Sequence, residues 1–186
     1  MRARTFEILY RSDVLNPLTL TVVEQSPVRK GGTGADALQE TIELAVACES
    51  MGYERFWVAE HHNIGGIAST SPEILIGQIG AATSRIRVGS GGVMLPHYSA
   101  FKVAENFRML ETLFPGRVDL GLGRAPGGDQ RTMLAMSYPS SPIDVRAYPE
   151  QIEDLIGFLG DSLPADHPFS ALRAGPPPEG APEVWL

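Results

Sequence analysis

Short apolar runs alternate with segments of helical spacing along most of this chain. Four such runs begin near residues 18, 55, 86 and 117, at intervals of 31 to 37 residues. Each run is followed by apolar residues three or four positions apart, which is typical of a helix packed on a sheet. Alternation at this spacing predicts a parallel sheet with right-handed crossover helices. The final residues, 184–186, have the character of the first residues of a fifth strand.

Capping and turn residues set the expected bounds of these elements. Ser71 is an N-cap residue followed by Pro72 at the first helical position, and Gly52 is a stop signal at a helix C-terminus. Residues 1–17 lack the pattern and are expected to form an N-terminal extension. The expected strands cover 18–25, 55–59, 86–95 and 118–123. The expected helices cover 35–51, two segments that begin at 72 and 99, and 144–159. The segments 130–143 and 161–183 are expected to be irregular.

The length of the chain limits what this alternation can build. At 186 residues the chain can bury the core of one domain, but an eight-stranded barrel takes about 250. Four βα units would therefore make half of a barrel. Such a half would leave two open strand edges and an uncovered inner face, so we expect something to pair with them.

The composition argues against several classes of partner and site. A net charge of −7, with scattered Lys and Arg, argues against a nucleic-acid surface. No apolar stretch reaches the roughly 18 residues that cross a membrane, and no signal-peptide pattern follows Met1. The single cysteine, Cys48, excludes an internal disulfide and lies in a helical pattern, which predicts core packing. We therefore expect a cytoplasmic protein.

The second expected strand ends in a carboxylate and two imidazoles, Glu60, His61 and His62. In parallel α/β folds this end of a strand is where ligands and chemistry lie. Because successive strand residues alternate faces, Glu60 and His62 share one side and His61 faces the other. Three interpretations stay open: an imidazole that acts as acid, base or donor to a cofactor, capping at a strand end, and a metal site that would need His97 and Asp119.

Glycines mark two further places on the chain. Gly89, Gly91 and Gly92 lie within the third expected strand, where glycine indicates either a bulge or a close approach by a flat cofactor. The segment 121–128 is rich in glycine and carries Arg124, which could bind an anion. This segment does not fit a dinucleotide fingerprint, because its spacing is not G-x-G-x-x-G and it follows the fourth strand.

Three segments, in this order, resemble the bacterial luciferase-like monooxygenase family, in particular its group 1 oxidoreductases. The resemblance runs from about Leu18 to the end of the chain. It implies an α/β fold of the (β/α)8 TIM-barrel type, of which residues 18–186 hold about the first four βα units and end at the start of strand five. The segments are Phe56-Trp-Val-Ala-Glu-His-His-Asn63, Ile86-Arg-Val-Gly-Ser-Gly-Gly-Val-Met-Leu-Pro-His97 and Pro115-Gly-Arg-Val-Asp-Leu-Gly-Leu-Gly-Arg-Ala-Pro-Gly127.

The resemblance also implies an activity and roles for particular residues. The protein would be a flavin-dependent monooxygenase that uses reduced FMN and O₂ on a small organic substrate, with a flavin reductase as the source of reduced FMN. His61 matches the catalytic histidine near the reactive edge of the flavin, and Glu60 matches a neighbouring pocket carboxylate. Gly91 and Gly92 match a pair that lies against the isoalloxazine ring and is joined by a cis peptide bond in relatives. Arg124 matches a flavin-site arginine, and no metal is expected.

The sequence departs from the family pattern at two points. Ala100 stands where relatives often have proline. Relatives are nearly twice as long, and their FMN phosphate lies at the turn after the fifth strand, so we expect the ring-binding half without the phosphate anchor. Alternatives stay open: a non-catalytic truncated half-barrel that forms a homo-oligomer or pairs with a separate second half, a deazaflavin-dependent relative, and an NAD(P)-binding domain based on the Gly121 loop.

Overall fold

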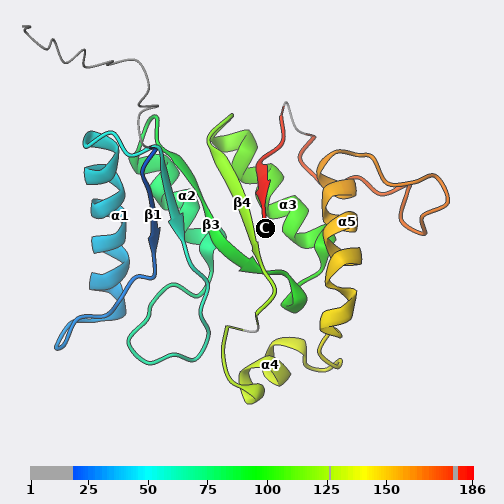
Figure 1. Cartoon of the computed structure of the whole chain (residues 1–186), viewed down its shortest axis with the longest axis horizontal. Coiled ribbons are helices and arrows are strands. Elements are labelled where there is room, and N and C mark those ends of the chain that lie inside the picture. The colour runs from blue at the N-terminus through cyan, green and yellow to red at the C-terminus, as the bar shows by residue number, and fades with distance from the viewer. Residues whose placement is uncertain (1–18, 126, 178–179) are drawn as a thin grey trace, which may run out of the picture.

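Strands and helices alternate along the whole of the chain that the structure describes (Figure 1). The structure is a computed structural model and describes residues 19–125, 127–177 and 180–186. The extension expected at 1–17, and Leu18, lie outside the described residues. In chain order the elements are β1 (Thr21–Glu24), α1 (Gly34–Ser50), β2 (Arg55–Val58), α2 (Pro72–Ala82), β3 (Arg87–Met94), η1 (Leu95–His97), α3 (Ala100–Leu113), β4 (Val118–Gly123), α4 (Gln130–Ser137), η2 (Val145–Ala147), α5 (Tyr148–Leu159) and β5 (Glu183–Trp185).

The five strands form one parallel sheet in the order β1-β2-β3-β4-β5, which confirms the predicted architecture. In Figure 1, α2 and α3 lie behind the sheet, and α1 and α5 lie at its two sides. Because all the strands run the same way, the loops that follow β1 to β4 gather at one edge of the sheet. Within the described residues, no helix combines the length and the apolar character that a membrane crossing requires.

One face of the sheet, here called the helix face, packs against the helices and holds the apolar core. Phe56 and Val58 of β2 are fully buried there, as are Val88 of β3 and Leu120 of β4. Burying a side chain of this size contributes about 1.5–3 kcal/mol. Cys48 is buried in the same cluster, as its helical spacing predicted.

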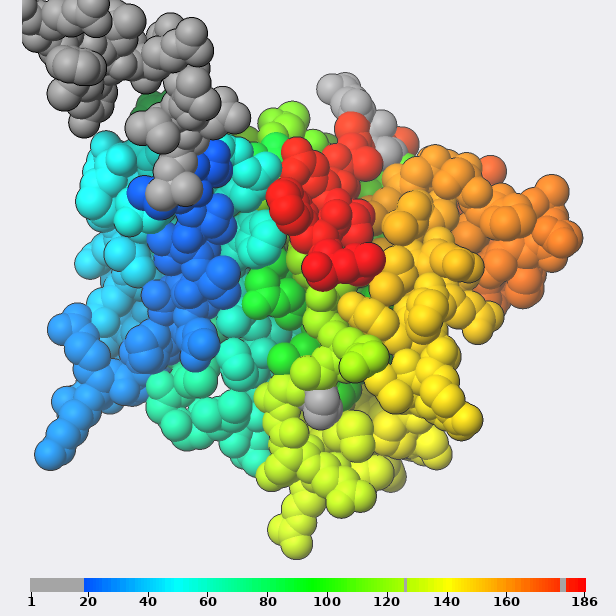
Figure 2. Space-filling view, in the orientation of Figure 1, coloured from blue at the N-terminus to red at the C-terminus, as the bar shows by residue number. Residues whose placement is uncertain are grey.

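The opposite face of the sheet, here called the inner face, carries a layer of charge. Asp119 of β4 is fully buried and accepts hydrogen bonds from Arg55 Nε at 3.2 Å, Trp57 Nε1 at 2.9 Å and Arg87 Nε at 2.9 Å. Glu183 of β5 lies 3.2 Å from Arg55 Nη2 and 3.3 Å from Arg87 Nη2. Figure 2 shows β1 and β5 on the side that faces the viewer, with no helix in front of them. Within the described residues the inner face is therefore open, and its charges are paired with one another.

In the C-terminal third one prediction is wrong, and one predicted helix starts later than expected. Residues 130–143, expected to be irregular, contain α4, which begins where Asp129 accepts a hydrogen bond from Thr132 N at 2.8 Å. This helix buries none of its residues, so no apolar periodicity marked it in the sequence. The helix expected at 144–159 begins instead as the short turn η2, because the Asp144 carboxylate accepts from Arg146 N at 2.9 Å, and α5 starts only at Tyr148.

Candidate functional site

Loops from three strands meet at the edge where Glu60, His61 and His62 leave β2. The N–H of His61 donates to the carbonyl of Ser69 at 3.0 Å, and the N–H of His62 donates to the carbonyl of Gly127 at 2.9 Å. The second of these bonds ties the segment after β2 to the loop after β4. Gly128 lies so close that an added Cβ would be 2.9 Å from the His62 carbonyl oxygen. The strand end is thus fixed by backbone contacts on both sides.

Glu60 and His62 point to the same side, as the alternation of strand residues predicts. The Glu60 side chain is 1% exposed. Its Oε1 accepts from the Tyr98 hydroxyl at 2.6 Å and lies 2.6 Å from His62 Nε2, and its Oε2 accepts from Met94 N at 2.8 Å. Burial, together with the hydrogen bond to Glu60, raises the pKa of Tyr98 well above its usual range, so this phenol stays a donor. The carboxylate therefore holds the His62 ring in one orientation.

His61 takes no part in this cluster. Its ring is partly exposed, but Nδ1 is buried and has no hydrogen-bond partner within the described residues. A buried ring nitrogen without a partner costs roughly 1–3 kcal/mol, and most such atoms in proteins are satisfied by another group. Within the described residues His61 Nδ1 therefore stays unsatisfied, whereas His62 Nε2 contacts Glu60.

Gly91 and Gly92 lie on the inner face, where a pocket of about 370 Å³ opens at β3 and β4. The bond between them is cis, as the resemblance implied, and the β3–β4 register shifts between Ser90 and Val93. A Cβ on Gly92 would lie 2.7 Å from the Gly121 carbonyl oxygen, so neighbouring backbone requires this glycine. The register of β3 is thus irregular at these glycines, and the pocket that they line lies beside Trp57.

Arg124 follows β4 directly and is exposed. Burial raises the pKa of the Tyr148 phenol, while the nearby positive charge of Arg124 opposes that rise. Beyond Arg124 the loop turns back, and Asp129 Oδ2 accepts from Asn63 Nδ2 at 3.4 Å. The guanidinium is therefore placed at the same edge as the histidines, on the surface.

Sequence reasoning missed the aromatic partners of this edge. Tyr98 was not singled out, and His97 was considered only as a metal ligand; yet the His62 and His97 rings meet edge to face with centroids 5.9 Å apart. His97 and Tyr98 both follow the C-terminal end of β3, where functional residues of parallel sheets gather. That position alone could have marked them as candidates. Asp119 lies among arginines on the inner face, and within the described residues no three His, Cys, Asp or Glu side chains are grouped to hold a metal ion.

The luciferase-like monooxygenase family model matches residues 18–185. The chain belongs to this family. The Bacillus subtilis N-acetyl-S-alkylcysteine monooxygenase is 46% identical over 91% of this chain and 50% of its own length. The uncharacterized protein YwcH of the same organism is 53% identical, also over 91% of this chain and 50% of its own. The chain spans about half the length of the curated relatives it matches.

Solved structures place the fold among the TIM barrels of this family. Apo-MsnO8 is 44% identical and superposes with a TM-score of 0.83, over 91% of this chain and 49% of that chain. Two more distant structures share the fold. A type II Baeyer–Villiger monooxygenase in complex with FMN is 20% identical, with a TM-score of 0.64 over 74% of this chain and 38% of that chain. An F420-dependent secondary alcohol dehydrogenase is 16% identical, with a TM-score of 0.67 over 89% of this chain and 51% of that chain. The luciferase-like chain described here is therefore of the (β/α)8 type and covers about half of such a barrel.

Proposed function

We propose that this protein is a flavin-dependent monooxygenase that uses reduced FMN and O₂ on a small organic substrate. The observation that carries the proposal is the glycine-lined pocket on the inner face, at Gly91 and Gly92. Its volume of about 370 Å³ falls within the range of about 300–1,000 Å³ that is usual for small-molecule sites. Membership of an oxidoreductase family supports redox chemistry at this site.

The pocket lining fits the ring of a flavin better than its phosphate. Gly91 and Gly121 leave backbone uncovered, and Trp57, Leu122 and Trp185 supply apolar surface around it. A Cβ on Gly91 would lie 3.2 Å from Val23 Cγ1 and would narrow the space. None of the described residues that line this pocket carries a positive charge. Bound here, a reduced flavin would supply the electrons for O₂ activation.

We assign three roles to the residues at the strand ends. His61 would accept and return a proton through Nδ1, the buried atom that has no partner among the described residues. Glu60 would position His62, since its carboxylate contacts Nε2 at 2.6 Å. Arg124 would bind an anionic group of the cofactor or substrate, because its guanidinium is exposed at the same edge.

A second cofactor and two kinds of protein partner belong to the same proposal. The F420-dependent neighbour makes a deazaflavin the alternative cofactor for the pocket. A separate flavin reductase would deliver reduced FMN. The open inner face and the strand edges of β1 and β5 favour pairing with a second copy or with the other half of a barrel.

Anaerobic titration of the 186-residue chain with reduced FMN, followed by tryptophan fluorescence, tests the binding step, because Trp57 and Trp185 line the pocket. We expect saturable quenching, and a parallel titration with reduced F420 distinguishes the two cofactors. If neither cofactor gives saturable quenching, the enzyme proposal fails for this chain.

The variant His61→Ala tests the proton-transfer role. We expect turnover to fall about 10²–10⁴-fold while flavin affinity changes little, since general acid–base catalysis contributes rate enhancements of that order. The matched control is His167→Ala, which removes an imidazole in the segment after α5. Equal losses of binding and turnover in His61→Ala would instead indicate a structural role.

A further inference from the structure

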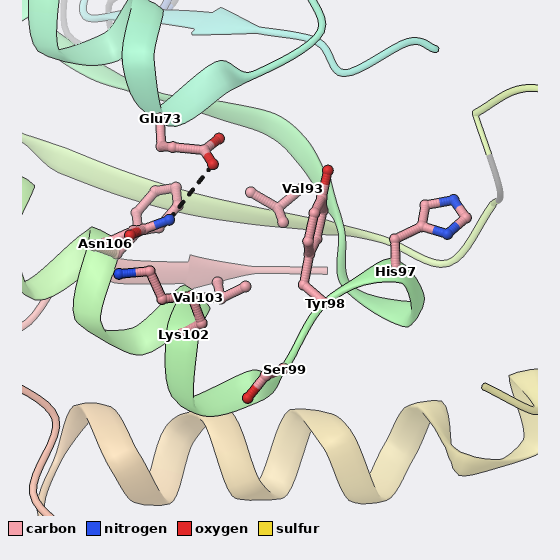
Figure 3. A pocket seen from close by; sticks show the side chains of 9 residues that line it. Glu73, Val93, His97, Tyr98, Ser99, Lys102, Val103 and Asn106 are labelled. Carbon is pink, nitrogen blue, oxygen red and sulfur yellow. Dashed lines mark hydrogen bonds between the residues drawn. The ribbon is translucent and has the colours of Figure 1, made fainter. Parts of the chain in front are cut away.

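A second cavity, of about 260 Å³, lies on the helix face, between α2, α3 and the residues that follow β3 (Figure 3). Its floor is apolar and consists of Val93, Val103 and Phe107, all of which are buried. The Tyr98 ring forms one wall, and His97 also lines the cavity, on the far side of that ring in Figure 3. This space is distinct from the glycine-lined pocket, which opens on the opposite face of the sheet.

Polar groups meet at one side of this cavity. Glu73, in the first turn of α2, accepts a hydrogen bond from Asn106 Nδ2 of α3 at 3.4 Å, and both side chains line the space. Besides its own backbone N–H, the Glu73 carboxylate has Asn106 as its hydrogen-bond partner within the described residues. The 3.4 Å bond is long, and Asn106 keeps its carbonyl oxygen as a further acceptor. The polar side therefore presents mainly acceptors.

The carboxylate and the ammonium that line the cavity, Glu73 and Lys102, are not paired with each other. The ammonium of Lys102, at the rim, lies 3.3 Å from Glu105 Oε2 and is mostly exposed, so it already has an anionic partner. Burial is the main cause that raises the pKa of Glu73; the hydrogen bond from its own N–H opposes the rise, the charge of Glu60 adds to it, and the charges of His62 and Lys102 oppose it. Within the described residues no ion pair reaches the Glu73 carboxylate, so a cation beside it would offset the cost of its burial.

We propose that this cavity binds a small organic ammonium ion. The charged head would lie beside the Glu73 carboxylate and the Asn106 carbonyl oxygen, and a short apolar body would rest on the Val93, Val103 and Phe107 floor. The volume is slightly below the range of about 300–1,000 Å³ for drug-sized ligands, which limits the ligand to a small molecule. A bound ion would touch Tyr98, whose hydroxyl donates to Glu60 at 2.6 Å.

Titration of the ¹⁵N-labelled chain with three probes of equal length, followed by amide chemical shifts, tests the proposal without any flavin. The probes are n-butylammonium, butan-1-ol and butyrate. We expect saturable shifts around Val93 and the first turns of α3, with butylammonium bound at least about tenfold more tightly than the other two, a difference of about 1.4 kcal/mol. Equal affinity for all three probes, tighter binding of butyrate, or no saturable shift would overturn it.

Two variants locate the site. Glu73→Gln is expected to reduce butylammonium affinity to that of butan-1-ol, whereas Glu43→Gln, the same change on the exposed side of α1, is expected to leave it unaltered. Equal effects of Glu73→Gln and Glu43→Gln on butylammonium affinity would contradict the assignment of the site to Glu73. Val103→Phe fills the floor and is expected to abolish binding of both butylammonium and butan-1-ol. If either cavity variant fails to fold, the three-probe comparison on the unaltered chain decides the question.

Discussion

At the scale of single residues, Glu60 depends on its hydrogen-bond donors. A buried carboxylate is costly unless donors surround it; Glu60 accepts from Met94 N and the Tyr98 hydroxyl and also contacts His62 Nε2. Tyr98→Phe removes one donor and leaves the ring in place. We expect the free energy of unfolding to fall by about 1.5–3 kcal/mol, as for a hydrogen bond to a charged group, measured by urea denaturation. Tyr138→Phe, at an 83% exposed residue, is the control with an expected change within about 0.5 kcal/mol; equal losses would contradict the role of Tyr98.

The sequence could predict which way these residues point, but not what they contact. Alternation along β2 was sufficient to place Glu60 and His62 on one side, because it depends only on local backbone geometry. The Tyr98 contact joins residues 38 positions apart and depends on how η1 packs against β2. Asp119 was considered as a metal ligand because the sequence does not show which residues pair with it. Its arginine partners, Arg55 and Arg87, lie on other strands. The partners of buried polar groups are set by tertiary packing.

At the scale of elements, one carboxylate joins α1 to the turn between α2 and β3. Glu49 Oε1 accepts from the N–H groups of Ser84, Arg85 and Ile86 at 2.9, 2.6 and 2.9 Å. Burial alone would raise the pKa of Glu49, but these three bonds outweigh it and lower the pKa. We expect Glu49→Gln to lower the free energy of unfolding by about 1 kcal/mol at neutral pH. This is less than is usual for hydrogen bonds to a charged group, because the carboxylate is partly solvated.

The pH dependence of that difference follows from its sign. Because the folded pKa is lowered, the contribution of Glu49 is fully present above the unfolded value of about 4.3 and is lost as pH falls through the lower folded value. Unfolding curves of the wild type and Glu49→Gln should therefore converge in acid. Glu43→Gln on the same helix should change little at any pH, and a difference between Glu49→Gln and the wild type that persists below pH of about 2 would contradict the assignment.

The start of α3 allows a stabilising substitution. Ala100 is the first helical residue after Ser99, whose φ of −69° and ψ of 127° suit a residue before proline. We expect Ala100→Pro to raise the unfolding free energy by about 0.4–1 kcal/mol, because proline restricts the unfolded chain and the first helical N–H needs no partner. Ala104→Pro, one turn further into the helix, should cost about 3 kcal/mol or more. Thermal denaturation separates the two, and a loss of stability in Ala100→Pro would contradict this account of the helix start.

At the scale of the whole molecule, the order and direction of the strands could be predicted, whereas the weakly packed elements could not. The 31- to 37-residue repeat determined the parallel sheet, because each unit buries an apolar strand under a helix. The helix α4 buries no residue, so only the Asp129 cap marked it. The charge layer of the inner face was also missed, since its members come from four strands.

That inner-face layer joins β2, β3, β4 and β5, and Asp119 is its centre. Asp119→Ala would leave Arg55 and Arg87, which are 15% and 19% exposed at their side chains, without their buried partner. Removing one member of a buried ion pair leaves an uncompensated charge and typically costs about 3–5 kcal/mol, and Glu183, 51% exposed, can neutralise only part of it. Asp144→Ala removes the surface pair with Arg146, in which the arginine is 88% exposed, together with the cap of η2, and is the control with an expected loss smaller than that of Asp119→Ala. Both are measured by urea denaturation with intrinsic fluorescence, because Trp57 donates to Asp119 and reports on the layer directly. If Asp119→Ala were as mild as Asp144→Ala, the arginines of the inner face would be held by solvent rather than by this carboxylate.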